Sequence, residues 1–337
     1  MADESGRRVA AIVVAHNGGD DLLDCLASLT AQVGSDPEII VVDNASSDDS
    51  IVRAERRFGR RVRVVRRATN DGYAAGANAG RRATNAGWIA ILNQDLTLAP
   101  DCLSTLMDVV RDWPTTAIAS PLLRLRSSPD LVNAVGNAIH WSGVAWCHGA
   151  GTPASSWSGT IEVAGVSGAA FLLSAEVFDR LGGLDERFFM YMEDVDLSLR
   201  ARSLGYACVV SCEADALHDW RLALSPDKFE RLETNRRVVW SRYVAGPGRR
   251  SMLLLQAEAM AWLYAMLRGR KHLRAKLRAS RHRVPITDRP DGRTRIEPWL
   301  STQHPYEILF PGKTTLHSIG RLADRIVLKL AGVSPGR

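Results

Sequence analysis

The chain has 337 residues, of which 46% are hydrophobic and 24% are charged. These fractions are typical of globular proteins and exclude a disordered, collagen-like or coiled-coil chain. No apolar run reaches the roughly 18–20 residues of a membrane-spanning helix, because the best candidate, Met252 to Leu267, contains Gln256 and Glu258. The N-terminal MADESGRR lacks an apolar core, so we expect no signal peptide. Five cysteines without a C-x-x-C pair exclude a zinc knuckle and favour a reducing cytoplasm.

The net charge of +6 is unevenly distributed along the chain. Residues 246–337 hold 18 basic and 6 acidic side chains, and residues 1–245 hold 25 basic and 31 acidic ones. The sign changes at Gly246-Pro247-Gly248, a turn-rich stretch typical of a domain boundary. We therefore predict one domain over residues 1–245 and a basic C-terminal extension over residues 246–337. A basic extension of this kind is typical of binding to nucleic acid, to a membrane surface or to an acidic partner.

The front half alternates apolar runs with helical patterns. Continuous β-branched runs are typical of strands that are buried on both faces of a parallel sheet. We expect strands over Val9–Ala15, Ile39–Val42, Val62–Val65 and Trp88–Leu92, with helices beginning near Asp20, Ser50 and Ala74. Asp20 or Asp21 is the expected N-cap of the first helix. The alternation predicts an α/β fold with a doubly wound, mostly parallel sheet.

A polar cluster follows each expected strand. Ligands of open α/β sheets bind outside the carboxyl ends of the strands, so the informative clusters are His16-Asn17, Asp43-Asn44, Asn70-Asp71-Gly72 and Asn93-Gln94-Asp95. Any one of them is explained as a turn or a helix cap, but four at one sheet edge favour a ligand site. Without G-x-G-x-x-G or G-x-x-x-x-G-K-[ST], the dehydrogenase and P-loop classes lose their main support.

Two carboxylates in these clusters suit a nucleotide. Asp43 can accept a hydrogen bond from a base N–H, such as N3–H of uracil or thymine. Asp95 stands beside Asn93 and can hold a hard divalent cation on a pyrophosphate, because such cations prefer oxygen ligands. The alternative for Asp95 is a cap for the helix expected after Pro100.

Three carboxylates, Glu193, Asp194 and Asp196, directly follow the aromatic run from Phe188 to Met192. A carboxylate at an apolar border has a raised pKa, which suits a general base. The alternative is that the three carboxylates stabilise the first turn of a helix through its dipole. The lone His218 follows an expected strand at residues 208–211, and its place in the chain leaves a structural role and a ligand role open.

The sequence resembles the family 2 inverting glycosyltransferases of the GT-A fold, in particular the rhamnosyltransferase-like branch. The likeness covers residues 9 to about 243, through stretches that occur in the same order. They are VAAIVVAHN (9–17), EIIVVDNASSDDS (38–50), NDGYAAGANAG (70–80), WIAILNQDLTLAPDCL (88–103) and VSGAAFLLSAEVFDRLGGLDERFFMYMEDVDLSLRARSLGY (166–206). Each stretch alone is a weak signal, but their joint order and spacing is a strong one.

The resemblance implies a substrate site. It puts His16 beside the nucleotide base, where the family usually has Tyr, and Asp43 on the base itself. Asn70 opens the next nucleotide-contacting segment. Asn93-Gln94-Asp95 matches the D-x-D motif with Asn in the first place, which puts Asn93 on ribose or phosphate.

The same resemblance implies the chemistry. Asp95 and His218 are the expected ligands of Mg²⁺ or Mn²⁺. Asp194 matches the catalytic base, and Glu193 is expected among the substrate-binding residues. Asp194 would take a proton from the acceptor hydroxyl in a single displacement that inverts the anomeric carbon, while the metal neutralises the leaving diphosphate.

The implied activity is transfer of a sugar from a nucleoside-diphosphate sugar to a glycan or polyprenyl-pyrophosphate-linked acceptor in cell-envelope polysaccharide synthesis. The leading donor is dTDP-rhamnose, with UDP- and GDP-sugars open because Asp43 can satisfy more than one base. One alternative is a nucleotidyltransferase, which predicts a Gly-rich loop with Arg or Lys after the first strand. Another is a catalytically silent sugar-binding or scaffold subunit of a glycan assembly complex.

The basic extension begins with an amphipathic pattern. One helical face holds Leu253, Ala257, Met260, Tyr264 and Leu267, and residues 268–283 then carry basic side chains and no acidic one. This suits a helix on an anionic membrane surface, so we expect a cytoplasmic protein on the inner face of the membrane. No recognition motif supports nucleic acid. The alternative is a packing helix with a solvated basic end. A last helix is expected over residues 316–330.

Overall fold

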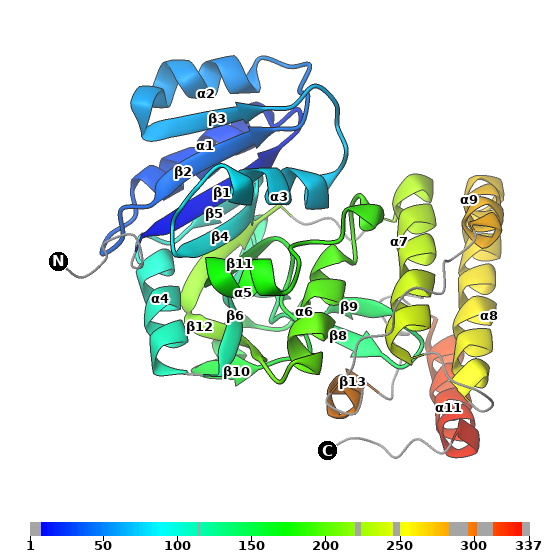
Figure 1. Cartoon of the computed structure of the whole chain (residues 1–337). Coiled ribbons are helices and arrows are strands. Elements are labelled where there is room, and N and C mark those ends of the chain that lie inside the picture. Colours follow the sequence, from blue (N-terminus) through cyan, green and yellow to red (C-terminus); the bar gives the residue numbers. More distant parts are fainter. Residues whose placement is uncertain are drawn as a thin grey trace. The chain divides into compact units, whose positions relative to one another are not determined.

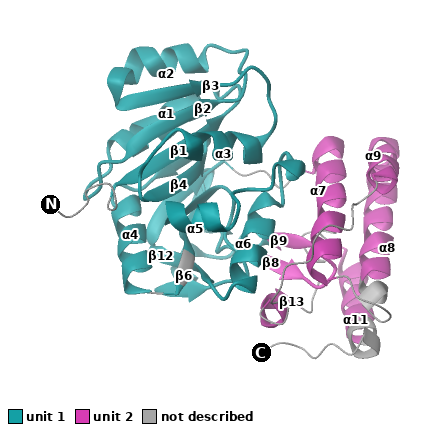
Figure 2. Ribbon diagram, viewed as in Figure 1, with its two compact units in different colours: residues 1–137, 147–221 teal, residues 138–146, 222–337 magenta. Residues whose placement is uncertain are grey.

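The computed structural model describes residues 8–113, 115–219, 224–244, 250–282, 296–301 and 313–331. The chain forms two compact units (Figure 2). One comprises residues 1–137 and 147–221, and the other comprises residues 138–146 and 222–337. The boundary predicted at Gly246-Pro247-Gly248 lies outside the described residues, so the division at residue 245 stays a prediction.

A mixed β-sheet is the centre of the first unit (Figure 1). In sheet order its strands are β10 (Thr160–Glu162), β12 (Ala207–His218), β6 (Thr116–Leu125), β11 (Ala170–Ser174), β4 (Trp88–Asn93), β1 (Val9–Ala15), β2 (Glu38–Asp43) and β3 (Val62–Arg66). Off this path, β5 (Leu96–Leu98) pairs with β12 and β7 (Ser128–Ala134) pairs with β6. Strands β4, β1, β2 and β3 are mutually parallel, whereas β11, β10, β5 and β7 run antiparallel to their neighbours.

Helices cover both faces of this sheet, which confirms the predicted α/β, doubly wound class. Successive side chains of β1 alternate between two apolar cores, with Ala11 and Val13 in one and Ala10 and Ile12 in the other. The first core takes side chains from α1 (Gly19–Thr30), α2 (Ser50–Phe58) and α4 (Cys102–Asp112). The second takes them from α3 (Tyr73–Arg82), α5 (Ala175–Arg180) and α6 (Glu193–Ser203).

Two sequence-based expectations need correction. Asp20 and Asp21 do not cap α1, because the helix begins at Gly19 and both carboxylates lie inside its first turn. The Gly19 N–H instead donates to Asp48 Oδ2 at 3.0 Å, from the loop after β2. The strand expected at residues 208–211 extends to His218, because β12 pairs with β6 on both sides of a register shift between Ser211 and Asp215.

The strand order creates a switch point. β1 lies between β4 and β2, so the chain leaves β1 toward one side of the sheet and reaches β4 on the other. Ligands of open α/β sheets bind in the crevice at the carboxyl ends of such strands. The loops at residues 16–18 and 93–95 both begin at this edge.

The second unit is mainly helical. It contains α7 (Pro226–Val239) with a π-turn over Trp240–Val244, α8 (Arg250–Arg268), α9 (Arg270–Arg281), α11 (Thr314–Ala331), and a small sheet of β13 (Leu300–Ser301), β8 (Asn137–His140) and β9 (Ala145–Cys147). The helix predicted over residues 316–330 is confirmed as α11. Phe229 of α7 stacks on Tyr264 of α8, with ring centroids 5.2 Å apart.

The apolar face predicted on α8 is largely internal. Ala257 and Tyr264 are buried, and Tyr264 belongs to a core that Phe229, Ala265 and Ala275 complete. This face packs within the unit because α7 and α9 cover it. The expected contact of this face with a membrane is therefore wrong for Ala257 and Tyr264, whereas Leu267 is exposed and the side chain of Leu253 lies outside what the structure describes.

Four charged side chains join the helices of this unit. Lys276 of α9 is 0% exposed, and its Nζ lies 2.7 Å from Glu233 Oε2 and 2.7 Å from Glu258 Oε2. Arg236 Nε lies 2.9 Å from Glu233 Oε1, and its Nη2 lies 2.6 Å from Glu258 Oε1. Burial raises the pKa of Glu233, but the charges of Arg236 and Lys276 outweigh burial and hold that pKa below its ordinary value. The cluster is neutral, so each charge depends on the others.

Removing one charge of this cluster is expected to destabilise the unit. Lys276→Met leaves two carboxylates sharing Arg236 in a buried site, which we expect to lower the free energy of unfolding by about 3 kcal/mol. Lys271→Met on the exposed side of the same helix is the matched control and is expected to change it by less than about 0.5 kcal/mol. Urea unfolding followed by circular dichroism measures both. Equal midpoints for the two variants would contradict the assigned role of Lys276.

Candidate active site

Gln94 bridges the two loops at the switch point. The His16 N–H donates to Gln94 Oε1 at 2.8 Å, and Gln94 Nε2 donates back to the His16 carbonyl at 3.2 Å. A Cβ at Gly18 would lie 2.8 Å from the same Oε1, so the close approach requires glycine there. The middle residue of Asn93-Gln94-Asp95 thus fixes the loop after β1 to the loop after β4.

Asp43 lies buried at the end of β2. Its Oδ1 accepts a hydrogen bond from the Ser46 N–H at 2.8 Å. Its Oδ2 has no hydrogen-bond partner in the described chain. The position leaves one carboxylate oxygen available to a donor such as a base N–H.

Asn44 joins the other nucleotide-side residues. The carbonyl of Asn44 lies 3.0 Å from His16 Nδ1, so this nitrogen carries the proton and donates. Asn44 Nδ2 donates to the Gly72 carbonyl at 2.8 Å. Asn70 Oδ1 accepts from the Gly72 N–H at 3.0 Å, which closes a turn of its own loop. The structure therefore brings His16, Asp43 and Asn70 into one loop cluster.

Asp95 and His218 meet although they are far apart in sequence. The antiparallel pairing of β5 with β12 sets Leu96 opposite His218, and Asp95 Oδ1 lies 3.4 Å from His218 Nε2. His218 Nδ1 donates to Asn133 Oδ1 at 2.8 Å. Its Nε2 faces Asp95 Oδ1, a buried oxygen without a hydrogen-bond partner.

This arrangement fits a divalent cation. A buried carboxylate oxygen and a ring nitrogen 3.4 Å apart can act together as ligands of one cation, and a metal-binding histidine normally donates its other ring N–H to an oxygen. Arg126 Nη2 donates to the Asp95 carbonyl at 2.9 Å, and its Nη1 lies 3.4 Å from Asp21 Oδ1. Burial raises the pKa of Asp21, and the charge of Asp95 adds to this effect. Across the described residues, no group of three or more His, Cys, Asp or Glu side chains is arranged to hold a metal.

Asp194 is tightly held at the start of α6. Its Oδ2 accepts from the Gly168 N–H at 2.7 Å and from Asn137 Nδ2 at 2.8 Å, and its Oδ1 accepts from the Val195 N–H at 2.8 Å. Burial raises the pKa of Asp194, although these donors act against the increase. The carboxylate is thus oriented by three N–H groups and kept more basic than an exposed aspartate.

Glu193 beside it has the opposite surroundings. It is 5% exposed, and its Oε2 has no hydrogen-bond partner. Burial and the charge of Asp194 raise the pKa of Glu193 to about 8. Near neutral pH the pair therefore shares one proton, which Glu193 holds because Asp194 has the donors that stabilise a carboxylate.

A strained backbone precedes the two carboxylates. Phe189, Tyr191 and Met192 have φ values of 57°, 70° and 73°, in the left-handed region that non-glycine residues rarely adopt. The Tyr73 N–H donates to the Phe189 carbonyl at 2.6 Å, and Gly72 packs against it so closely that a Cβ would lie 2.2 Å from this oxygen. The start of α3 therefore clamps the segment, and such strain is typical of functional sites.

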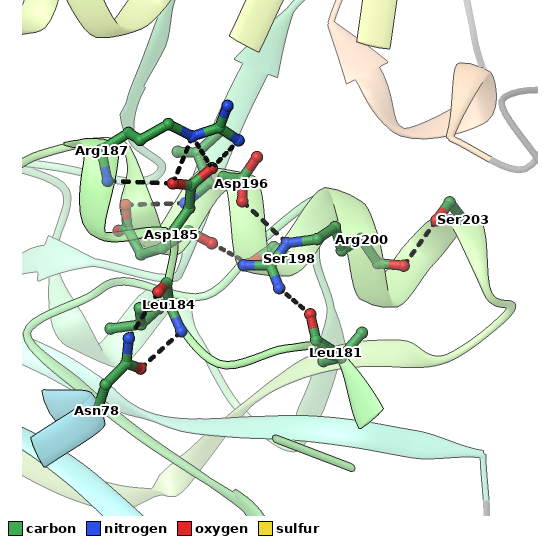
Figure 3. Close-up of polar contacts among 11 residues, drawn as sticks. Asn78, Leu181, Leu184, Asp185, Arg187, Asp196, Ser198, Arg200 and Ser203 are labelled. Atoms are coloured by element: carbon green, nitrogen blue, oxygen red, sulfur yellow. Dashed lines mark hydrogen bonds and ion pairs between the residues drawn. The ribbon is translucent and has the colours of Figure 1, made fainter. Parts of the chain in front are cut away.

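Further contacts anchor α6 and the chain that leads into it (Figure 3). Arg200 Nε donates to Asp196 Oδ2 at 2.9 Å, and its Nη1 donates to the Leu181 carbonyl. Asn78 of α3 bonds both backbone groups of Leu184, with distances of 2.8 and 2.9 Å. Asp196 is therefore structural, whereas its neighbour Asp194 lies at the site.

Tyr73 supports the loop that holds Asp194. Its hydroxyl donates to the Gly168 carbonyl at 2.7 Å, and the N–H of Gly168 holds Asp194. Burial raises the pKa of Tyr73 well above its ordinary value, and the charges of Glu193, Asp194 and Asp95 add to the increase. The charges of Asp95 and Asp194 therefore both act on this tyrosine.

Sequence reasoning missed several supporting residues. Tyr73 lies inside the quoted stretch NDGYAAGANAG but was not singled out. Asn133 and Asn137 orient His218 and Asp194 from a segment that carried no recognisable motif. Two asparagines four apart beside the apolar residues of VNAVGN were the one available signal.

Comparison with known proteins defines the class. The model of "Glycosyl transferase family 2" matches residues 10–135, and that of "Glycosyl transferase family group 2" matches residues 88–267. The chain belongs to the family 2 glycosyltransferases and is a glycosyltransferase by class. The predicted membership of this family is confirmed.

One curated relative and two solved structures are informative. An N-acetylglucosaminyl-diphospho-decaprenol L-rhamnosyltransferase of Mycobacterium tuberculosis is 28% identical over 237 residues, covering 61% of this chain and 74% of that protein. The structure of GalNAc-T7 with UDP, GalNAc and Mn²⁺ has a TM-score of 0.58 at 14% identity, covering 74% of this chain and 51% of that one. The mannosyltransferase of Pyrobaculum calidifontis with GDP-Man and Mn²⁺ has a TM-score of 0.53 at 17% identity, covering 96% and 86%. The two structures confirm the GT-A fold.

The raised pKa of Glu193 predicts a pH effect on stability. Between its ordinary pKa of 4.5 and the folded value of about 8, the folded state retains a proton that the unfolded state releases. Stability therefore falls as pH rises through this window. Glu193→Gln removes this contribution, so between pH 6 and 8 the wild type should lose about 2 kcal/mol more stability than the variant. Thermal unfolding at both pH values measures the difference.

Glu176→Gln on the exposed side of α5 is the matched control and should retain the wild-type pH dependence. If the stability of Glu193→Gln changes with pH as that of the wild type does, Glu193 is ionised in the folded protein. The assignment of the shared proton to Glu193 would then be wrong.

Proposed function

We propose that this enzyme transfers a sugar from a nucleoside-diphosphate sugar by a single inverting displacement, with Asp194 as the base. The observations that support it most are a half-buried Asp194 carboxylate held by three N–H groups, and Asp95 within 3.4 Å of His218 directly after β4. A general base and a site for a charged leaving group are the two elements that such a transfer needs.

Asp95 Oδ1 and His218 Nε2 are the residues that would hold Mg²⁺ or Mn²⁺. Two protein ligands suit a cation whose remaining ligands are phosphate oxygens and water. The cation would neutralise charge on the leaving diphosphate. Mn²⁺ in both structural neighbours supports this assignment. Asn133 would keep His218 in the tautomer that binds a metal.

The chain's own residues perform the rest. Asp194 accepts the proton of the acceptor hydroxyl while that oxygen forms a bond to the anomeric carbon and the bond to the diphosphate oxygen breaks. Gly168 and Asn137 keep the carboxylate aimed. Glu193, which is protonated, leaves Asp194 as the ionised member of the pair. A single carboxylate suffices for the reaction, because the leaving group is a diphosphate that needs no proton from a second carboxylic acid.

His16, Asp43, Asn70 and Asn93 are proposed to bind the nucleotide. The free Oδ2 of Asp43 suits the N3–H of uracil or thymine, and a guanine N–H suits it equally. The relative that acts as a rhamnosyltransferase supports dTDP-rhamnose as the leading donor and a polyprenyl-pyrophosphate-linked acceptor. The neighbours with UDP and GDP-Man keep UDP- and GDP-sugars open.

The place of action follows from such an acceptor. Among the described helices, none is both long enough and apolar enough to cross a membrane. We propose that the enzyme works in the cytoplasm, at the inner face of the membrane in which a polyprenyl-linked acceptor is embedded.

The nucleotidyltransferase alternative lacks support at its expected position. The loop after β1 is held by Gln94 and contains His16, Asn17, Gly18 and Gly19, without the Arg or Lys that this alternative predicts. A catalytically silent subunit would not need Asp194 to be oriented by three donors. Both are therefore less well supported than sugar transfer.

Substitution of the base tests the proposal. Asp194→Asn keeps the shape and the donors near the site but cannot take a proton, so kcat should fall at least about 10³-fold. The donor dissociation constant should change less than about threefold. Nucleoside diphosphate release from a panel of dTDP-, UDP- and GDP-sugars with Mn²⁺ gives kcat, and calorimetry gives the dissociation constant.

Glu193→Gln is the matched comparison at the adjacent position. Because Glu193 is neutral at pH 7, this variant should retain kcat within about tenfold. Loss of activity in Glu193→Gln together with an active Asp194→Asn would assign the base to Glu193 and contradict the proposal.

A further inference from the structure

The exposed side of α9 is a strongly basic surface with no assigned role. Arg270, Arg274, Leu277 and Arg281 are spaced i, i+4, i+7 and i+11, which puts them along one face of the helix. All four are exposed, whereas Ala275, Lys276 and Ala279 on the opposite face are buried. We call this row, with the exposed Lys271 beside it, the α9 ridge. Figure 2 shows α9 in the second unit.

The cations of the ridge have no partner among the described residues. The side chains of Arg270, Lys271, Arg274 and Arg281 form no ion pair or hydrogen bond there. Other basic residues nearby differ, since Arg278 pairs with Glu230 and Lys276 pairs with Glu233 and Glu258. Within the described part of the chain, the ridge thus concentrates positive charge that no acidic side chain neutralises.

Exposed apolar side chains accompany these cations. Met266 and Leu267 at the end of α8 are 57% and 56% exposed, and Leu277 within the ridge is 44% exposed. Gly269, with a φ of 92°, separates α8 from α9. Met266 and Leu267 therefore lie four and three residues before Arg270, the first arginine of the ridge. Exposed Met and Leu beside unpaired Arg and Lys are typical of a helix at a lipid interface, which accepts apolar side chains below a layer of charge.

We propose that the α9 ridge, with Met266 and Leu267, binds a bilayer surface rich in anionic lipid. A nucleic acid offers phosphates for the cations but no apolar phase in which Met266, Leu267 and Leu277 could be buried, so it fits the surface less well. The internal face of α8 takes no part, because α7 and α9 cover it. The inference deepens the proposed function by naming the surface that would hold the enzyme near a lipid-linked acceptor.

Vesicle binding tests the inference without catalysis. The full chain is mixed with sucrose-loaded vesicles of phosphatidylcholine alone or with 30% phosphatidylglycerol, and the bound fraction is measured after sedimentation. We expect binding only with phosphatidylglycerol, weakened by 0.5 M NaCl because salt screens the charges. The variant Arg270→Glu/Arg274→Glu/Arg281→Glu should bind about a hundredfold more weakly. The milder Arg270→Gln/Arg274→Gln/Arg281→Gln should show an intermediate loss.

A matched control changes the net charge equally elsewhere. Arg56, Arg57 and Arg60 are exposed on the first unit and make no ion pair among the described residues, and their reversal to Glu should leave vesicle binding within about threefold. Met266→Ser/Leu267→Ser should weaken binding at high salt more than the control does. Equal loss in the ridge and control variants, or no binding to phosphatidylglycerol vesicles, would overturn the inference. Retention on duplex DNA but not on vesicles would overturn it in favour of nucleic acid.

The outcome separates this inference from the catalytic proposal. The ridge residues lie outside the proposed active site, so nucleoside diphosphate release by the ridge variants in vesicle-free solution should match the wild type. A chain that binds vesicles but releases no nucleotide contradicts the catalytic proposal alone. A protein that releases nucleoside diphosphate from the donor but does not bind vesicles contradicts only the proposal that the α9 ridge binds lipid.

Discussion

Coverage of the sheet on both faces is the constraint on which the first unit depends. The inner strands β4, β1 and β2 present apolar side chains to two cores, so polar groups can lie only where the strands end. Because β1 lies between β4 and β2, their loops share one edge, and Gln94 ties two of them together. The register of β5 against β12 then brings His218 to Asp95. The site takes its position from apolar packing.

Burial also determines the chemistry. Glu193 and Asp194 are adjacent and both lose water, yet only Asp194 gains N–H donors. One is therefore a neutral acid and the other an oriented carboxylate. This placement comes with a strained backbone between Phe189 and Met192, which a hydrogen bond from the Tyr73 N–H to the Phe189 carbonyl holds in place. The Asp194 carboxylate therefore combines a raised pKa with a fixed orientation.

Much of this was predictable from sequence because the signals are local. Apolar runs located β1 to β4, and the family resemblance singled out Asp95, Asp194 and His218, of which the structure brings Asp95 and His218 within 3.4 Å of each other. Asn133 and Asn137 were not predicted, since the spacing of the two asparagines does not indicate their partners, which lie 85 and 57 residues away in sequence. The apolar stripe on α8 was misassigned, because periodicity indicates that a face is covered but not what covers it. The same packing turns the basic face of α9 outward.

Calorimetric titration of the purified chain with dTDP-, UDP- and GDP-sugars tests the central claim most directly, because binding needs no acceptor. With Mn²⁺ present, one of these donors should bind, and EDTA should weaken that binding at least about tenfold, since the diphosphate would lose the cation held by Asp95 and His218. Equal affinity in EDTA would contradict the metal assignment. Failure of every donor to bind in the presence of Mn²⁺ would contradict the account of this sheet edge as a nucleotide-sugar site.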